Sequence, residues 1–100
     1  DLIITGGLNV YPPEVELVLM DHEAVAGCAV IGCPNEEWGE SVMAVIIKAN
    51  DTNITADELI DYCREHLASY KAPRRIVFAD VFPQNALGKI QKAKLRESLC

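Results

Sequence analysis

Apolar side chains form continuous runs along this chain, and the length of each run indicates what it builds. Two long runs, Ala24–Cys33 and Ser41–Lys48, are rich in Val, Ile and Ala and are typical of buried strands. Two shorter runs, Leu2–Thr5 and Ile76–Phe78, predict further strands. Residues that favour turns separate these runs, so we expect the strands to be distinct elements.

Three other segments carry the spacing of a helix. The first is expected to begin at Pro12-Pro13, because proline suits the opening of a helix, and to end near Asp21. The second should begin after Thr55, which forms a capping-box pattern with Glu58. The third is predicted over Ile90–Leu99, where apolar residues recur one helical turn apart.

In chain order these elements predict an α+β fold, with a small, mainly antiparallel sheet flanked by about three helices. The sheet is expected to hold about three strands plus the short N-terminal strand. The two long strands should pair antiparallel, although the loop Pro34–Gly39 is longer than a simple hairpin turn. A length of 100 residues without repeats predicts one domain over residues 1–100.

The composition is typical of a folded globular domain, with half of the residues hydrophobic and 24% charged. No apolar run reaches the roughly 18 residues of a membrane span. We expect a cytoplasmic protein whose cysteines are reduced and structural, because their spacing matches no metal site: Cys28, Cys33, Cys63 and Cys100. The chain opens on a strand-like run without Met, so we interpret it as a piece of a larger polypeptide.

Charge is divided unevenly between the two ends of the chain. Residues 1–65 carry 13 acidic and 2 basic side chains, whereas residues 66–100 carry 7 basic and 2 acidic ones. The last third could therefore meet a phosphorylated small molecule, the alternative being a basic helix that is only solvated. Nucleic acid is a poor candidate partner, because the pI is 4.7 and only 6% of residues are aromatic.

Two glycine-containing segments are candidates for chemistry. Gly6-Gly7 follows the first strand, where it forms either a tight turn or a surface that a ligand can approach closely. Lys89 follows Gly88 just ahead of a basic helix, so it is either an ordinary surface lysine or a ligand for phosphate or carboxylate oxygens. The second segment is not a P-loop, because Ile90 stands where that motif has Ser or Thr.

Taken together, the two segments resemble the C-terminal domain of the acyl-adenylate-forming (AMP-binding) ligases. Residues 1–16 fit Asp-x-Ile-x-x-Gly-Gly-x-Asn-Val-x-Pro-x-Glu-Val-Glu, and residues 83–90 fit Pro-x-x-x-x-Gly-Lys-Ile. Tyr70–Pro73 and Cys33–Glu40 are also similar to that family, so the resemblance covers essentially the whole chain.

The resemblance implies an acyl-CoA synthetase that uses ATP, Mg²⁺ and CoA. In such enzymes a carboxylic acid and ATP form an acyl-adenylate, which the CoA thiol then attacks with release of AMP. The small domain rotates between these steps. By resemblance, Lys89 serves adenylation, and Gly6 and Gly7 face the pantetheine arm of CoA. Arg74 and Arg75 would contact CoA phosphates, unless they only solvate the end of a strand.

The resemblance also names the partners of this domain. The hinge residue is expected before Asp1, and a large N-terminal domain of the same polypeptide should hold the acyl pocket and most of the Mg²⁺ site. The isolated domain is therefore expected to be inactive. Trp38 either anchors its loop or contacts the large domain or a nucleotide.

The details of both segments favour one branch of the family. Gly-Gly-Leu-Asn-Val-Tyr-Pro is more similar to CoA ligases than to peptide-synthetase domains, and the flanking residues look most like malonyl-CoA synthetases and fatty-acid–CoA ligases. Two alternatives remain open. One is a stand-alone binding module without catalysis, and the other is an acyl-AMP ligase that loads a carrier protein.

Overall fold

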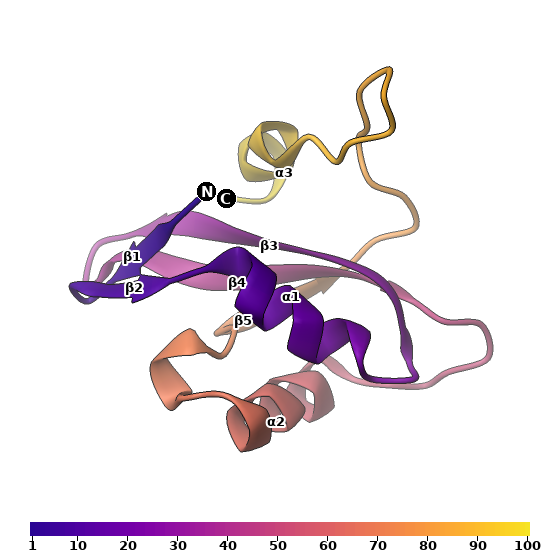
Figure 1. Ribbon diagram of the computed structural model, residues 1–100, viewed down its shortest axis with the longest axis horizontal. Helices are drawn as coiled ribbons and strands as arrows, with labels where there is room; N and C mark the ends of the chain where they lie inside the picture. Colours follow the sequence, from indigo (N-terminus) through magenta and orange to yellow (C-terminus); the bar gives the residue numbers. More distant parts are fainter.

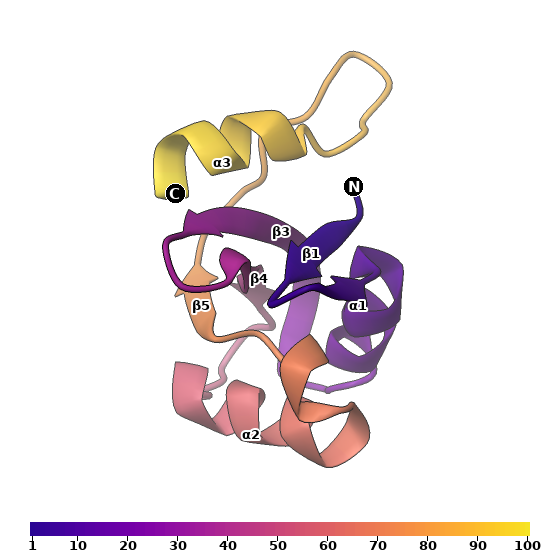
Figure 2. The same ribbon diagram turned by 90° about the vertical axis from the view of Figure 1, so that its left-hand side faces the viewer.

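The computed structural model describes residues 1–100 and has three layers. A five-stranded sheet separates α1 (Pro12–Met20) and α2 (Ala56–His66) on one face from α3 (Lys92–Leu99) on the other (Figures 1 and 2). A short 3-10 turn, η1 (Ser69–Lys71), follows α2. The expected α+β class with about three helices is confirmed.

The sheet is built around one long antiparallel hairpin. Strands β3 (Val25–Asn35) and β4 (Gly39–Lys48) form this hairpin, and β5 (Arg75–Phe78) runs parallel to β4 on its other edge. Strand β1 (Ile3–Thr5) joins the start of β4 and pairs antiparallel with β2 (Leu8–Val10). The strand order is β2-β1-β4-β3, with β5 beside β4.

Residues of β3 and β4 are buried on both faces of the sheet, which explains why these strands are continuous apolar runs. One set packs under α1 and α2, namely Val30, Val42, Ala44 and Ile46. The alternate set packs under α3, namely Ala29, Ile31, Cys33, Met43 and Val45. Leu95 is the buried residue that fixes α3 to this second cluster.

Most helix boundaries agree with their sequence signals. Helix α1 begins at Pro12, and Thr55 and Glu58 exchange both hydrogen bonds of the capping box at the start of α2. Helix α3 begins later than expected, at Lys92, because Ile90 is paired with Gln84 in an isolated antiparallel bridge.

Two strand expectations need correction. Strand β2 was not predicted, because Leu8–Val10 is too short to show a period. The hairpin connection is also tighter than expected, since Asn35 pairs with Gly39 and leaves only residues 36–38 outside the strands. The Asn35 side chain closes this turn by accepting hydrogen bonds from the backbone N–H groups of Glu37 and Trp38 at 2.9 and 3.0 Å.

The expectation of four reduced cysteines is wrong for two of them. Cys33 in β3 and Cys100 after α3 form a disulfide across the face of the sheet, with a Cα–Cα distance of 5.3 Å. Cys28 and Cys63 are free. Spacing alone could not reveal this pair, because its partners are 67 residues apart and meet only once α3 packs over β3. None of the helices is long and apolar enough to cross a membrane.

Candidate functional site

Lys89 lies at the base of a short loop that is closed by hydrogen bonds to a single residue. The backbone N–H of Asn85 donates to the carbonyl of Lys89 at 2.9 Å, and the N–H of Gly88 donates to the carbonyl of Asn85 at 2.9 Å. The side-chain Oδ1 of Asn85 accepts from the N–H groups of Leu87 and Lys89 at 2.9 and 3.0 Å. Gly88 has a φ of +81°, which a residue without a side chain adopts easily.

The loop is joined to the body of the domain through α3. Lys92 in the first turn of α3 forms an ion pair with Glu16 of α1 at 2.9 Å. The same Glu16 carboxylate accepts a hydrogen bond from the backbone N–H of Val30 in β3 at 3.0 Å. Glu16 therefore links the first helix, the central hairpin and the helix that follows Lys89.

Lys89 borders an open groove of about 920 Å³ between α3 and α1. Its ammonium group is exposed, and the three ion pairs in the chain all involve other basic residues. Cys28 also lines the groove, but burial, together with the nearby Glu16 carboxylate, raises the pKa of its thiol to about 12. Cys28 therefore stays protonated near neutral pH and is not a candidate nucleophile.

Gly6 and Gly7 form the two-residue turn between β1 and β2. Their φ angles are +57° and +80°, as the tight hairpin turn with two left-handed residues requires. The N–H of Gly6 donates to the carbonyl of Trp38 at 2.9 Å, so the turn is tied to the β3–β4 connection. A Cβ atom on Gly7 would meet nothing within 4 Å, so the surface above it is open.

Beside this turn lies a hollow of about 260 Å³ whose lining includes Gly6, Trp38, Tyr70 and Arg74. The guanidinium carbon of Arg74 lies 3.5 Å from the centroid of the Trp38 ring. The structure thus brings Arg74 to the glycine turn. Arg75 is exposed at the start of β5 and does not line this hollow.

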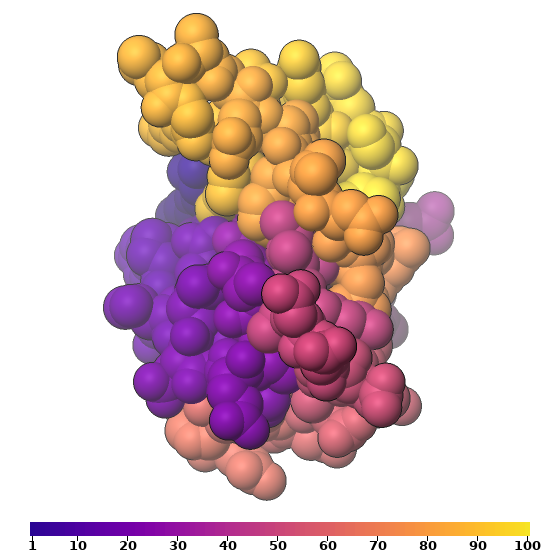
Figure 3. Space-filling view, turned by 90° about the vertical axis from the view of Figure 1, so that its right-hand side faces the viewer, coloured from indigo at the N-terminus to yellow at the C-terminus, as the bar shows by residue number.

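The lysine loop and the glycine turn lie at different ends of the molecule. Figure 1 shows the β1–β2 turn at one end of the long axis and the loop before α3 at the other side, above the sheet. The space-filling view shows the segment before α3 standing out from the body of the domain (Figure 3). Lys89 is therefore not in one site with Gly6 and Gly7.

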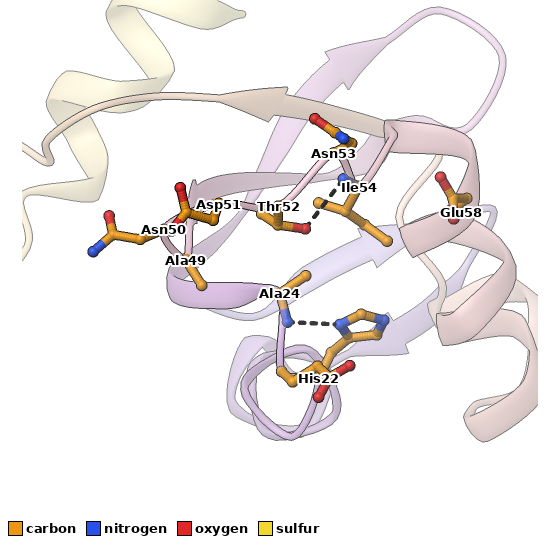
Figure 4. A pocket seen from close by; sticks show the side chains of 10 residues that line it. His22, Ala24, Ala49, Asn50, Asp51, Thr52, Asn53, Ile54 and Glu58 are labelled. Atoms are coloured by element: carbon orange, nitrogen blue, oxygen red, sulfur yellow. Dashed lines mark hydrogen bonds between the residues drawn. The ribbon is translucent and has the colours of Figure 1, made fainter.

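A further hollow of about 500 Å³ lies between the end of α1 and the loop before α2, away from all of these residues (Figure 4). The side chain of His22 accepts a hydrogen bond there from the N–H of Ala24 at 3.0 Å, which gives this histidine a structural role. The chain contains no group of three or more His, Cys, Asp or Glu side chains placed to hold a metal ion.

Comparison with known proteins settles the family. A model of the C-terminal domain of AMP-binding enzymes matches residues 14–89. The chain belongs to this family. The AMP-binding C-terminal domain described here is 44% identical over 97 residues to the long-chain-fatty-acid–CoA ligase FadD13 of Mycobacterium tuberculosis. That match covers 97% of this chain and 19% of the relative.

Solved structures agree with this assignment. The ATP-bound structure of MatB from Rhodopseudomonas palustris has a TM-score of 0.95 and 39% identity, and covers 98% of this chain and 20% of that one. The o-succinylbenzoate CoA synthetase MenE of Bacillus subtilis, in complex with an acyl-adenylate, has a TM-score of 0.89 and 43% identity, and covers 96% and 19%. The chain therefore spans about a fifth of the length of these relatives.

The structure of this AMP-binding C-terminal domain also gives contacts near the site to residues for which the sequence predicted no role. Asn85 closes the lysine loop, and Glu16 and Lys92 hold the helix behind it. Tyr70 lines the hollow beside the glycine turn. Asn85 and Tyr70 lie in segments that resemble the family, but only their place in the fold shows what they contact.

Proposed function

We propose that this chain is the C-terminal domain of an ATP-dependent acyl-CoA synthetase. The full enzyme would convert a carboxylic acid, ATP and CoA into acyl-CoA, AMP and pyrophosphate. Support comes from relatives named as CoA ligases or, in one case, a CoA synthase, which are 42–47% identical over nearly the whole chain. The observation that carries the proposal is Lys89, an exposed lysine without an acidic partner, held at the base of a hydrogen-bonded loop.

Lys89 is proposed to serve the adenylation step. A carboxylate must approach the α-phosphate of ATP, and both groups are anionic. An ammonium group placed between them offsets their repulsion and the negative charge that develops at phosphorus. A lysine that is already paired with a carboxylate would be less able to do this, and Lys89 has no such pair.

The glycine turn is proposed to face CoA in the second step. The open surface above Gly7 would leave room for the pantetheine arm, and the nearby Arg74 guanidinium would contact a CoA phosphate. Arg75 would contribute only if CoA reached the start of β5. The separation of the glycine turn from Lys89 supports two steps served by two faces of the domain (Figure 1).

The remaining parts of the reaction are assigned to the rest of the polypeptide. The acyl pocket, most of the ATP site and Mg²⁺ are proposed to lie in a large N-terminal domain, which is the main partner of this chain. Malonate and fatty acids are the proposed acid classes, because the sequence motifs look most like those of malonyl-CoA synthetases and fatty-acid–CoA ligases. A cytoplasmic location stays a prediction.

The test is a screen of the full-length protein for ATP-dependent pyrophosphate release. The acids should include malonate, ferulate, 2-succinylbenzoate and saturated fatty acids, each with and without CoA, and acyl-CoA should be detected by mass spectrometry. Release with acyl-CoA formation supports the proposal. Release with transfer only to a carrier protein would indicate an acyl-AMP ligase, and no release with any acid would favour a binding module.

A further inference from the structure

Asn85 supplies nearly all the bonds that close the loop before α3. Its side-chain oxygen accepts from two backbone N–H groups, its own N–H donates to Lys89, and its carbonyl accepts from Gly88. Both backbone groups of Lys89 are therefore bonded to the same residue. The Asn85–Lys89 backbone bond also belongs to the neck of the loop: together with a 2.8 Å bond from the N–H of Gln91 to the carbonyl of Pro83, it forms the Gln84–Ile90 bridge.

These bonds do little for the core of the domain. Asn85 is exposed, and so are its neighbours Leu87, Gly88 and Lys89. If the side-chain oxygen were removed, water could satisfy the released N–H groups, so the effect on global stability should be small. The bond from the Asn85 N–H to the Lys89 carbonyl would remain. What would be lost is the bond that fixes the Lys89 N–H, and with it the exact direction in which a long, flexible side chain leaves the backbone.

We propose that Asn85 is a positioning residue for Lys89. Its side-chain oxygen fixes the backbone from which the lysine ammonium group extends toward the reacting carboxylate and phosphate. This inference rests on the adenylation role of Lys89 proposed above. It assigns Asn85 no contact with substrate.

The experiment compares full-length variants in the two half-reactions. Adenylation is followed by ATP–pyrophosphate exchange with whichever of malonate, ferulate, 2-succinylbenzoate or palmitate is most active, and thioester formation by mixing the synthetic adenylate of that acid with CoA. Asn85→Ala should slow adenylation about 10- to 100-fold, the scale expected for a misplaced catalytic group. It should leave thioester formation and the melting temperature close to wild type.

Two variants serve as matched controls. Asn85→Ser keeps an uncharged acceptor oxygen that can bond the same backbone N–H groups more weakly, and it should restore part of the adenylation rate. Gln84→Ala removes a neighbouring exposed side chain that makes no hydrogen bond to the loop, and it should not change the rate. Hydrogen exchange of peptides covering residues 83–91 should accelerate in Asn85→Ala and remain unchanged in Gln84→Ala.

A double variant decides whether Asn85 acts through the lysine. In a Lys89→Ala background, Asn85→Ala should cause no further loss of adenylation. A full additional loss there, or an Asn85→Ser variant as slow as Asn85→Ala, would overturn the positioning role. If Lys89→Ala alone leaves adenylation intact, the proposed function of Lys89 fails and this inference fails with it. If Lys89→Ala is slow and Asn85→Ala is not, only the role of Asn85 is refuted.

Discussion

Gly32 in β3 lies against the side chain of Glu40, which connects β1 to the central hairpin through a hydrogen bond. Adding one methyl group at position 32 should weaken that connection. A Cβ atom at position 32 would lie 2.6 Å from Oε2 of Glu40 and 3.2 Å from Cγ1 of Ile3. The other carboxylate oxygen of Glu40 accepts a hydrogen bond from the backbone N–H of Ile4 at 3.0 Å. Apart from this bond, the β1–β4 ladder holds a single residue pair, Thr5 with Gly39.

The expected cost of Gly32→Ala follows from these contacts. The Glu40 carboxylate is the end of a flexible side chain, so it should move aside and lose its bond to Ile4, at roughly 1–2 kcal/mol for a partly exposed bond to a charged acceptor. The close contact with Ile3 adds about 1 kcal/mol of overpacking. Ala also lowers the backbone entropy of the unfolded chain, which stabilises the folded state by about 0.5–1 kcal/mol. The net loss should therefore be about 1–2.5 kcal/mol of unfolding free energy.

Urea unfolding of Gly32→Ala, Glu40→Ala and the double variant would measure this loss. In the Glu40→Ala background, Gly32→Ala should cost much less, because the carboxylate that it displaces is gone. Because β1 ends at the glycine turn, Gly32→Ala should also slow thioester formation more than adenylation. An unchanged midpoint of Gly32→Ala, or an equal cost in both backgrounds, would refute the role given to Glu40.

Three further predictions concern the two candidate faces and the free cysteines. Lys89→Ala in the full-length enzyme should slow ATP–pyrophosphate exchange by at least roughly 10²–10³-fold and spare thioester formation from supplied acyl-adenylate. An equal loss in both steps would contradict the role assigned to Lys89. Gly7→Asn, which tolerates the φ of +80°, should block thioester formation and keep exchange and melting temperature, whereas Gly7→Leu should also lower stability by roughly 1 kcal/mol or more. Burial raises the pKa of Cys28 to about 12 and that of Cys63 to about 11, from an ordinary 9.0. Above pH 9 these thiols ionise in the unfolded chain but stay protonated in the folded one, so the free energy of unfolding and the urea midpoint should fall as the pH rises. Cys28→Ala should flatten that fall, and a midpoint that does not change from pH 9 to pH 11 would be inconsistent with both shifts.

The sequence predicted the elements with strong local signals and missed those that depend on distant partners. The capping box at Thr55 and the proline start at Pro12 are local, and both appear in the structure. Strand β2 has three residues and exists because the glycine turn folds it back onto β1, so no period in the sequence marks it. The parallel pairing of β5 with β4 and the disulfide of Cys33 with Cys100 likewise depend on how α2 and α3 pack.

The candidate site shows the same division. Motif order pointed to Lys89 and to the glycine pair, but the two φ angles show that Gly6 and Gly7 are also needed by the turn itself. Arg74 and Arg75 looked equivalent in the sequence. The structure separates them, because only Arg74 stacks on Trp38 and borders the hollow beside the turn.

Charge along the chain also has a different meaning once the fold is known. Three of the seven basic residues in the last third are paired with carboxylates from residues 1–16: Lys71 with Glu14, Lys92 with Glu16, and Arg96 with Asp1. Two of those pairs hold α3 against the acidic first part of the chain, so much of the positive charge serves packing and not a ligand. Lys89, three residues before Lys92, has no such partner. The ion pairs between the two ends of the chain therefore hold α3, the helix that follows the loop. The absence of a carboxylate partner for Lys89 leaves its ammonium group free for an anion from outside the domain.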